Sequence, residues 1–246
     1  MDQQTKAALK QDKFVNTTTH GLEWASENRQ RVIAMGSLIL AVIIVVVTSV
    51  VVYNIRTEAA SLAFGQAMQV YQAPLSQPGE AASTEGTQKY STAADRAKAA
   101  SAAFQSVAEK YSLTPVGRNA RYFVGLTDIE AGQKQQAEDT LKQVASGWDS
   151  NLAALAKLAL AGLYRESNRD PEAIDLLNQL AAKPTTTVPY GLARLQLADL
   201  YASEGKSDDA RKVYADLQDK DSKGAAGAIA KQKLNPAAPG QPVQEQ

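Results

Sequence analysis

The sequence contains no cysteine and a single histidine, His20, among its 246 residues. Without cysteine there are no disulfides, iron–sulfur clusters, thiolate zinc sites or cysteine nucleophiles. One histidine gives no basis for a histidine metal cluster or a serine–histidine–aspartate triad. Basic and acidic residues balance at 26 each, so the strongly basic surface of a nucleic-acid-binding domain is also lacking. We therefore expect a protein that is not an enzyme, with no cofactor, metal, nucleic acid or small-molecule substrate.

One charge-free stretch is far longer than a β-strand. From Val32 to Tyr53 no residue is charged, and a helix of this length spans about 33 Å, close to the ~30 Å hydrocarbon core of a bilayer. A cleavable signal peptide is the alternative interpretation. However, the 31 preceding residues are too many for a usual n-region, and no small-x-small cleavage site follows Tyr53. The sequence therefore predicts a retained transmembrane helix over residues 32–53.

Cations gather on the N-terminal side of this stretch. After it, Arg56 stands alone until Lys89. Before it lie Lys6, Lys10, Lys13, Arg29 and Arg31. The positive-inside rule therefore predicts that residues 1–31 form a cytoplasmic tail and that the chain after the helix lies across the membrane.

Composition divides the remainder of the chain into four segments. Residues 54–73 continue a helical pattern as a juxtamembrane helix, which could itself be the first helix of the domain that follows. Residues 74–89, rich in Pro, Gly, Ser, Thr and Gln, are predicted to form a flexible loop, whose ordering on binding is left open. Residues 90–234 are predicted to form helical repeats ending in a capping helix, and residues 235–246 a disordered tail.

A pattern of small and large residues recurs three times within the repeat segment. A Gly or Ala is followed twelve residues later by an Ala, and larger apolar residues follow four and seven residues after that. Small residues at both places let two antiparallel helices approach closely, while the larger ones fill the space between neighbouring pairs. The three sets are Gly125, Ala137, Leu141 and Val144; Ala161, Ala173, Leu177 and Leu180; and Ala198, Ala210, Tyr214 and Leu217.

Residues that favour helix ends and helix starts lie at the positions where paired helices would be joined. Gly132, Asn168 and Gly205 each follow the first small residue by seven positions, and both residue types suit the left-handed turn that ends a helix. Helix starts are predicted at Thr114-Pro115, at Asp170-Pro171 with Asp170 as N-cap, and at Ser207 ahead of Asp208 and Asp209.

This pattern resembles the tetratricopeptide repeat, a helix–turn–helix of 34 residues that stacks into a solenoid. The intervals in this chain are 36 and 37 residues, and the additional residues fit loops near Ser146–Ser150 and Lys183–Pro189. The family's first-helix Trp is absent and its closing Pro is displaced or missing, so the repeats are divergent. The predicted fold is all-α: one transmembrane helix followed by a divergent tetratricopeptide-repeat-like helical solenoid.

A closer resemblance combines the two halves of the chain. Trp-Ala-Ser-Glu-Asn at 24–28, one membrane helix, Ala-Ser-Leu-Ala-Phe at 60–64 and divergent repeats resemble the family of membrane-anchored tetratricopeptide-like ancillary subunits of the Sec translocon. The repeats are also similar to those of the Tol-associated cell-division coordinator, which is normally soluble and secreted.

The resemblance implies a single-pass protein of the bacterial inner membrane with a periplasmic repeat domain. Its implied partners are the Sec translocon, a periplasmic chaperone or emerging polypeptides, which it would serve as a non-enzymatic scaffold. The alternative is a coordinator of envelope growth or cell division that uses the same repeat domain.

The first helix of each pair is expected to line a groove that could bind a partner. Most of the leucines in this groove are expected to pack between neighbouring helices, whereas Tyr122, Arg165 and Asp199 combine reach with polar groups. The candidate partner-binding residues are Asn119, Tyr122, Leu126, Arg165 and Asp199, with Ile129, Leu155, Leu158, Leu192 and Leu195 also lining the groove.

Two acidic pairs are interpreted as structural. Glu138-Asp139 and Asp208-Asp209 are neighbours in predicted helices, where adjacent side chains point about 100° apart and do not converge on a reacting group. Both pairs are expected to complement the positive end of a helix.

Overall fold

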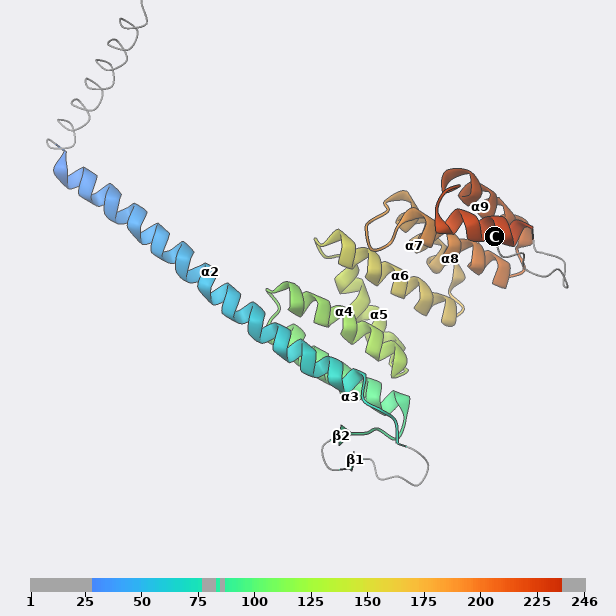
Figure 1. Ribbon diagram of the computed structural model, residues 1–246, viewed down its shortest axis with the longest axis horizontal. Helices are drawn as coiled ribbons and strands as arrows, with labels where there is room; N and C mark the ends of the chain where they lie inside the picture. The colour runs from blue at the N-terminus through green and yellow to red at the C-terminus, as the bar shows by residue number, and fades with distance from the viewer. Residues whose placement is uncertain (1–27, 77–82, 85–86, 236–246) are drawn as a thin grey trace, which may run out of the picture. The chain divides into compact units, whose positions relative to one another are not determined.

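The computed structural model describes residues 28–76, 83–84 and 87–235 (Figure 1). The chain divides into two units, Met1–Ile55 and Arg56–Gln246. Helix α2 (Arg29–Tyr71) begins in the first unit and ends in the second. Residues 1–27 of the predicted N-terminal tail (1–31) and residues 236–246 of the predicted C-terminal tail (235–246) lie outside the described residues.

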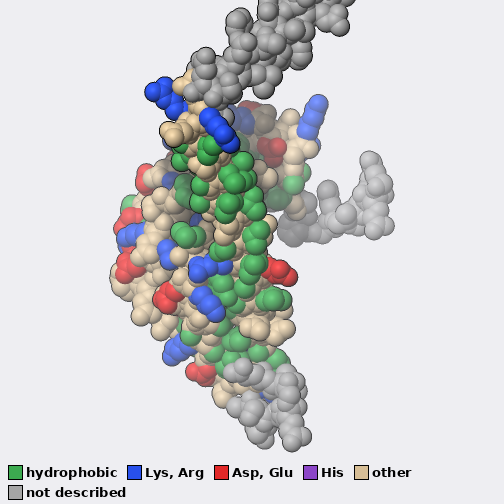
Figure 2. All heavy atoms as spheres, turned by 90° about the vertical axis from the view of Figure 1, so that its left-hand side faces the viewer, with side chains coloured by type: hydrophobic (Ala, Val, Ile, Leu, Met, Phe, Trp, Pro, Cys, Tyr) green, Lys and Arg blue, Asp and Glu red, His purple; other side chains and the backbone are tan. Residues whose placement is uncertain are grey.

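The N-terminal part of α2 is an apolar helix whose side chains face outwards all round. Its large hydrophobic side chains from Ile33 to Val52 are each 48–65% exposed, and Figure 2 shows hydrophobic side chains following one another along α2. The helix is long and apolar enough to cross a membrane. A helix that is hydrophobic on every side and covered by no protein is typical of a membrane span.

The second unit consists of successive helices that pack against their neighbours in sequence, as Figure 1 shows. Every element longer than two residues in the described ranges is a helix, which confirms the prediction of an all-α fold with one apolar N-terminal helix. The helices after α2 are α3 (Ala93–Lys110), α4 (Pro115–Glu130), α5 (Lys134–Ala145), α6 (Ser150–Glu166), α7 (Asp170–Ala182), α8 (Tyr190–Ser203), α9 (Ser207–Lys220) and α10 (Ala225–Leu234).

The three predicted left-handed turns are confirmed. Gly132, Asn168 and Gly205 have φ values of 76°, 56° and 75° and close α4, α6 and α8. In each turn an amide donates to the carbonyl five residues earlier, as in the Schellman motif. These bonds run from Gln133 to Asp128 (2.8 Å), from Arg169 to Tyr164 (2.8 Å) and from Lys206 to Tyr201 (2.9 Å).

The helix starts at Thr114-Pro115 and at Ser207 were predicted correctly, and the N-cap of α7 was placed one residue late. Thr114 caps α4, because its hydroxyl accepts a 3.0 Å hydrogen bond from the Gly117 amide. Asp170 is the first residue of α7 rather than its N-cap, and α9 begins at Ser207 with Asp208 and Asp209 in its first turn. The residue after each left-handed turn, Arg169 or Lys206, takes the N-cap position, so a single residue separates turn from helix.

The small and large residues of the repeat pattern form the core. A Cβ on Gly125 would lie 2.6 Å from Leu141 Cδ2, so a missing side chain in α4 makes room for α5. The remaining members are also buried: Ala137, Leu141, Val144, Ala161, Ala173, Leu177, Leu180, Ala198, Ala210, Tyr214 and Leu217.

A second core joins the end of α2 to α3 and α4. The ring of Phe64 lies 5.3 Å from that of Phe104 and 5.4 Å from that of Phe123, and Tyr71 adds two further edge contacts. The Tyr71 hydroxyl donates to Glu130 at 2.5 Å. We call this cluster the N-terminal core, and the larger cluster spanning α5 to α10 the C-terminal core.

The segment predicted as a flexible loop contains a short backbone pairing. Leu75 pairs with Tyr90, and the strands β1 (Ser83–Thr84) and β2 (Thr87–Gln88) pair antiparallel. Residues 77–82 and 85–86 lie outside the described residues, so the flexibility of the loop stays a prediction.

The residues that lengthen the repeats lie in loops, as predicted. The chain from Lys183 to Pro189 joins α7 to α8 and is fastened to the start of α6, because the Thr187 hydroxyl donates to the Asn151 carbonyl at 2.8 Å. Val188 in this loop is buried in the C-terminal core. The shorter extension between α5 and α6 includes Trp148.

Candidate protein-binding surface

The predicted groove residues lie on the first helices of three pairs, α4, α6 and α8. Asn119 and Arg165 are exposed, whereas Tyr122, Leu126 and Asp199 are half-buried. The helices α4 and α6 also contact one another directly. The groove itself stays a prediction, and its five candidate residues differ in how freely they could meet a partner.

Arg165 lines a hollow between α6 and α8. The hollow has a volume of about 180 Å³ and an apolar floor that includes Leu158 and Leu200. Gln196 of α8 lies on its wall, and Gly162 leaves it open, because no atom lies within 4 Å of where a Cβ would be. An exposed guanidinium above an apolar hollow can hold a partner's carbonyl or carboxylate while an apolar group enters below.

Asp199 and Tyr122 are tied into the fold. The Tyr214 hydroxyl donates to Asp199 at 2.8 Å, and Lys233 of α10 lies 3.9 Å from the same carboxylate oxygen. Burial and the bond to Asp199 raise the pKa of Tyr214 to about 12. Tyr122 packs against the C-terminal core, and burial raises the pKa of its hydroxyl. Asp199 thus links three helices, α8, α9 and α10, in addition to any contact with a partner.

The leucines of the predicted groove contribute to packing. They are partly buried and contact the C-terminal core, which agrees with the expectation that they pack between neighbouring helices: Leu155, Leu158, Leu192 and Leu195, together with Ile129.

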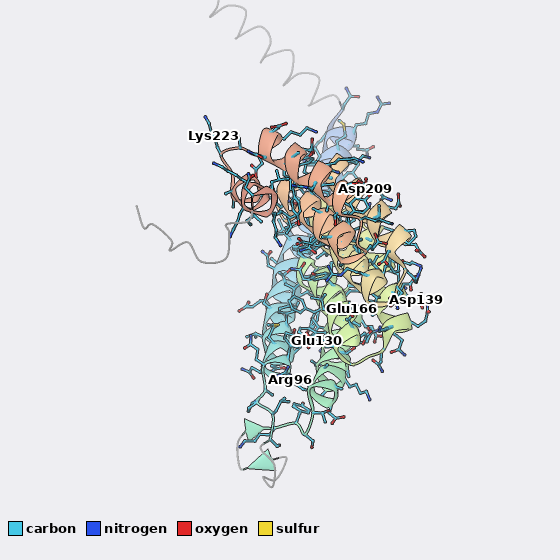
Figure 3. All side chains as sticks on the ribbon, turned by 90° about the vertical axis from the view of Figure 1, so that its right-hand side faces the viewer. Arg96, Glu130, Asp139, Glu166, Asp209 and Lys223 are labelled. Carbon is cyan, nitrogen blue, oxygen red and sulfur yellow. The ribbon has the colours of Figure 1, made fainter. Side chains whose placement is uncertain are left out.

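Glu138 has a structural role that differs from the predicted one. Its carboxylate lies 2.7 Å from Lys142 Nζ and 2.7 Å from Arg169 Nη1, and it accepts a 3.1 Å hydrogen bond from the Tyr164 hydroxyl. These bonds, Lys142 first, outweigh burial and hold the pKa of Glu138 below its ordinary value. Glu138 therefore joins α5 to the next pair rather than complementing a helix end, while its neighbour Asp139 is exposed at the edge of the molecule (Figure 3).

A similar network joins α8 to α9. Asp216 lies 2.8 Å from Lys220 Nζ and 3.2 Å from Arg194 Nη2, and it accepts a hydrogen bond from the Tyr190 hydroxyl. Burial raises the pKa of Asp216, but the bonds from Lys220 and Tyr190 outweigh it, so the net shift is downward.

The carboxylates of both networks are engaged within the fold. The two buried or half-buried networks hold their carboxylates against cations of the same fold, which leaves those carboxylates charged and occupied. In the ranges that the structure describes, no group of three His, Cys, Asp or Glu side chains could hold a metal ion. The position of Gln196 beside the hollow at Arg165 was not predicted from the sequence, because a single glutamine in an apolar helix gives no sign of a neighbouring hollow.

Paired antiparallel helices, left-handed turns at regular intervals and a row of first helices define a helical-repeat solenoid, a class of protein that generally binds other proteins. The chain matches the tetratricopeptide repeat-like domain family over residues 33–238 and belongs to that family. The match covers the apolar part of α2 as well as the repeats. No curated protein and no solved structure matches the chain.

Proposed function

We propose that this protein is a membrane-tethered scaffold that acts as an ancillary subunit of the Sec translocon and links secretion to periplasmic chaperones. The observation that supports it most directly is the combination, within one family match, of an apolar helix and a repeat domain. Repeats of this family usually mediate protein interactions. The resemblance of the motifs at 24–28 and 60–64 to the translocon-associated family adds the particular setting.

The proposed orientation has the N-terminus in the cytoplasm and the repeats in the periplasm. The five cations before the span, against Arg56 alone between the span and Lys89, support this orientation. Tethering keeps the groove beside the membrane and so raises its effective concentration for partners held there.

The proposal is tested by crosslinking from the groove in native membranes. A photoreactive phenylalanine replaces Gln196, beside Arg165, and the matched control replaces Asp139, which is exposed on α5. We expect a translocon component or a membrane-anchored chaperone to crosslink from the first position and not from the second. Arg165→Ala is expected to lower that yield by about fivefold or more, as removal of an interface arginine often does.

The outcome separates this function from its alternative. Crosslinks only to cell-wall or Tol components would favour a coordinator of envelope growth or cell division. The absence of every envelope partner, under conditions that preserve the translocon complex, would contradict both functions.

A further inference from the structure

Among the described residues of the repeat unit, the two most exposed large hydrophobic side chains belong to neighbouring turns. Leu113, between α3 and α4, is 83% exposed, and Trp148, between α5 and α6, is 79% exposed. Arg118 joins them, because its guanidinium carbon lies 4.6 Å from the centre of the Trp148 ring and its Nη1 donates to the Leu113 carbonyl at 3.5 Å.

A hollow of about 130 Å³ lies beside this pair of turns. Its lining includes the buried side chains of Val144 and Leu152, with Trp148, Arg118 and Arg121 around them. The volume is well below the roughly 300 Å³ at which typical cofactor and small-ligand pockets begin. It is suited to a single apolar side chain that projects from a larger partner.

The charge of the hollow is positive and only partly compensated. Among the described residues neither Arg118 nor Arg121 forms an ion pair, and the buried Nε of Arg118 has no hydrogen-bond partner. Asp149 also lines the hollow, but its carboxylate caps α6 by accepting from the Asn151 and Leu152 amides. Two guanidiniums against one carboxylate leave the lining with a net positive charge, which favours an anionic partner.

We propose that this hollow is a second docking site, which takes a protein segment bearing an apolar side chain next to a carboxylate. The apolar side chain enters against Val144 and Leu152, and the carboxylate meets Arg118 and Arg121. Trp and Arg are the residues most enriched among those that dominate binding energy. Asp149 and Arg165 stand at opposite ends of α6, about 24 Å apart along the helix, so this site is separate from the hollow beside Arg165.

The test uses Trp148 as its own reporter in the full chain, held in lipid nanodiscs. The sequence has two Trp residues, so Trp24→Phe leaves Trp148 as the only indole. The probes are the capped peptides acetyl-Glu-Leu-Leu-Glu-amide, acetyl-Gln-Leu-Leu-Gln-amide and acetyl-Glu-Gly-Gly-Glu-amide. We expect a saturable blue shift at millimolar concentrations of the first peptide, and binding about tenfold weaker for each of the others, which is about 1.4 kcal/mol.

Charge variants show whether the arginines are responsible. The double variant Arg118→Gln with Arg121→Gln is expected to weaken binding of acetyl-Glu-Leu-Leu-Glu-amide about tenfold. Binding of acetyl-Gln-Leu-Leu-Gln-amide should stay unchanged. Arg121→Gln alone, whose expected effect is smaller, replaces the double variant if that variant does not fold. Lys157→Gln, which removes a cation from the hollow between α6 and α7, is the matched control and should leave binding unchanged.

Three binding results would overturn the proposal. Equal binding of the Glu-Leu-Leu-Glu and Gln-Leu-Leu-Gln peptides would show that charge is not recognised, and equal binding of the two Glu-containing peptides would show that the apolar side chains are not. The third is the absence of a saturable response to any peptide. Trp148 emission that is already blue-shifted and shielded from a soluble quencher before peptide is added would place the ring in lipid and also exclude this site. None of these results depends on which partner occupies the groove, so the translocon proposal stands or fails separately.

Discussion

Two glycines in equivalent turns show how a missing side chain decides the packing of neighbouring helices. A Cβ on Gly117 would lie 2.0 Å from the Tyr111 carbonyl oxygen, and one on Gly227 would lie 2.1 Å from that of Asp221. Each glycine belongs to the first turn of its helix, and each contacted carbonyl belongs to the C-cap residue that directly follows the preceding helix. The backbone oxygen cannot move away as the tip of a side chain could.

Gly117→Ala is therefore expected to lower the free energy of unfolding by about 2–3 kcal/mol, as overpacking of a core does. Gly162→Ala is the matched control, because Gly162 lies within α6 and has nothing within 4 Å of a Cβ. It should raise stability by about 0.5–1 kcal/mol through helix propensity. Urea unfolding of the full chain measures both, and destabilisation of equal size in the two variants would contradict this account.

Asp128 makes stability depend on pH in the opposite direction from a salt-bridged acid. It is buried and accepts a 2.5 Å hydrogen bond from the Ser101 hydroxyl. Burial raises its pKa, and the Ser101 bond offsets only part of that rise. The folded protein therefore holds this proton more tightly than the unfolded chain, so its contribution to stability falls as pH rises from the ordinary aspartate pKa through the raised one.

Asp128→Asn keeps an acceptor for Ser101 and removes the charge. We expect it to raise the urea midpoint at about pH 7 relative to the unaltered protein, and to have less effect at about pH 4, near the ordinary aspartate pKa. Asp139→Asn, an exposed aspartate on α5, should change neither midpoint. A loss of stability at neutral pH in Asp128→Asn would show that the charged form is favoured in the fold.

At the scale of elements, the end of α2 is part of the repeat unit because of its aromatic side chains. Three of the four phenylalanines in the sequence, Phe64, Phe104 and Phe123, meet in the N-terminal core. Two residues labelled in Figure 3 bind the C-terminal end of α2 and the residues just after it. Arg96 donates a hydrogen bond to the Ala73 carbonyl, and Glu130 accepts one from the Tyr71 hydroxyl. The helices α2, α3 and α4 thus share a core that is distinct from the C-terminal core.

Phe64→Ala is expected to destabilise the N-terminal core by about 2 kcal/mol, since the ring is only partly buried. Amides of α3 and α4 should then exchange hydrogen roughly thirtyfold faster, whereas those of α7 to α9 keep their rates. Leu62→Ala on the same helix is the control, because Leu62 is 69% exposed. Faster exchange throughout the unit would instead indicate a single cooperative core.

The sequence specifies the order of the helices better than the contacts between distant ones. The spacing of Gly125, Ala161 and Ala198 predicted the pairs and their turns, because local packing and left-handed closure depend on residues close in sequence. The aromatic cluster and the bond from Ser101 to Asp128 join residues 19 to 59 positions apart, so they depend on how each helix is rotated in the fold.

The candidate binding residues illustrate the same limit. The register placed Asn119, Tyr122 and Arg165 on first helices, but it gave no sign that Asp199 bonds Tyr214 across a pair. Trp148 was equally hard to recognise, because its exposure depends on how the turn between α5 and α6 leaves the core.

At the scale of the whole molecule, the proposed function assigns tethering to the apolar helix and binding to the repeat unit. The exposed apolar side chains of α2 make a helix that could span a membrane, and the repeat unit has its own two cores and surface hollows. The central claim is that this helix crosses a bilayer and holds the repeats on the side away from the cytoplasm.

Because the sequence contains no cysteine, a single introduced thiol reports its own location without background. Ser222→Cys lies at an exposed position in the turn before α10, and Gln11→Cys lies in the N-terminal tail. With a membrane-impermeant maleimide added to spheroplasts, the account predicts labelling of Ser222→Cys at once and of Gln11→Cys only after the membrane is disrupted. The reverse order, or recovery of the protein in the soluble fraction, would contradict it.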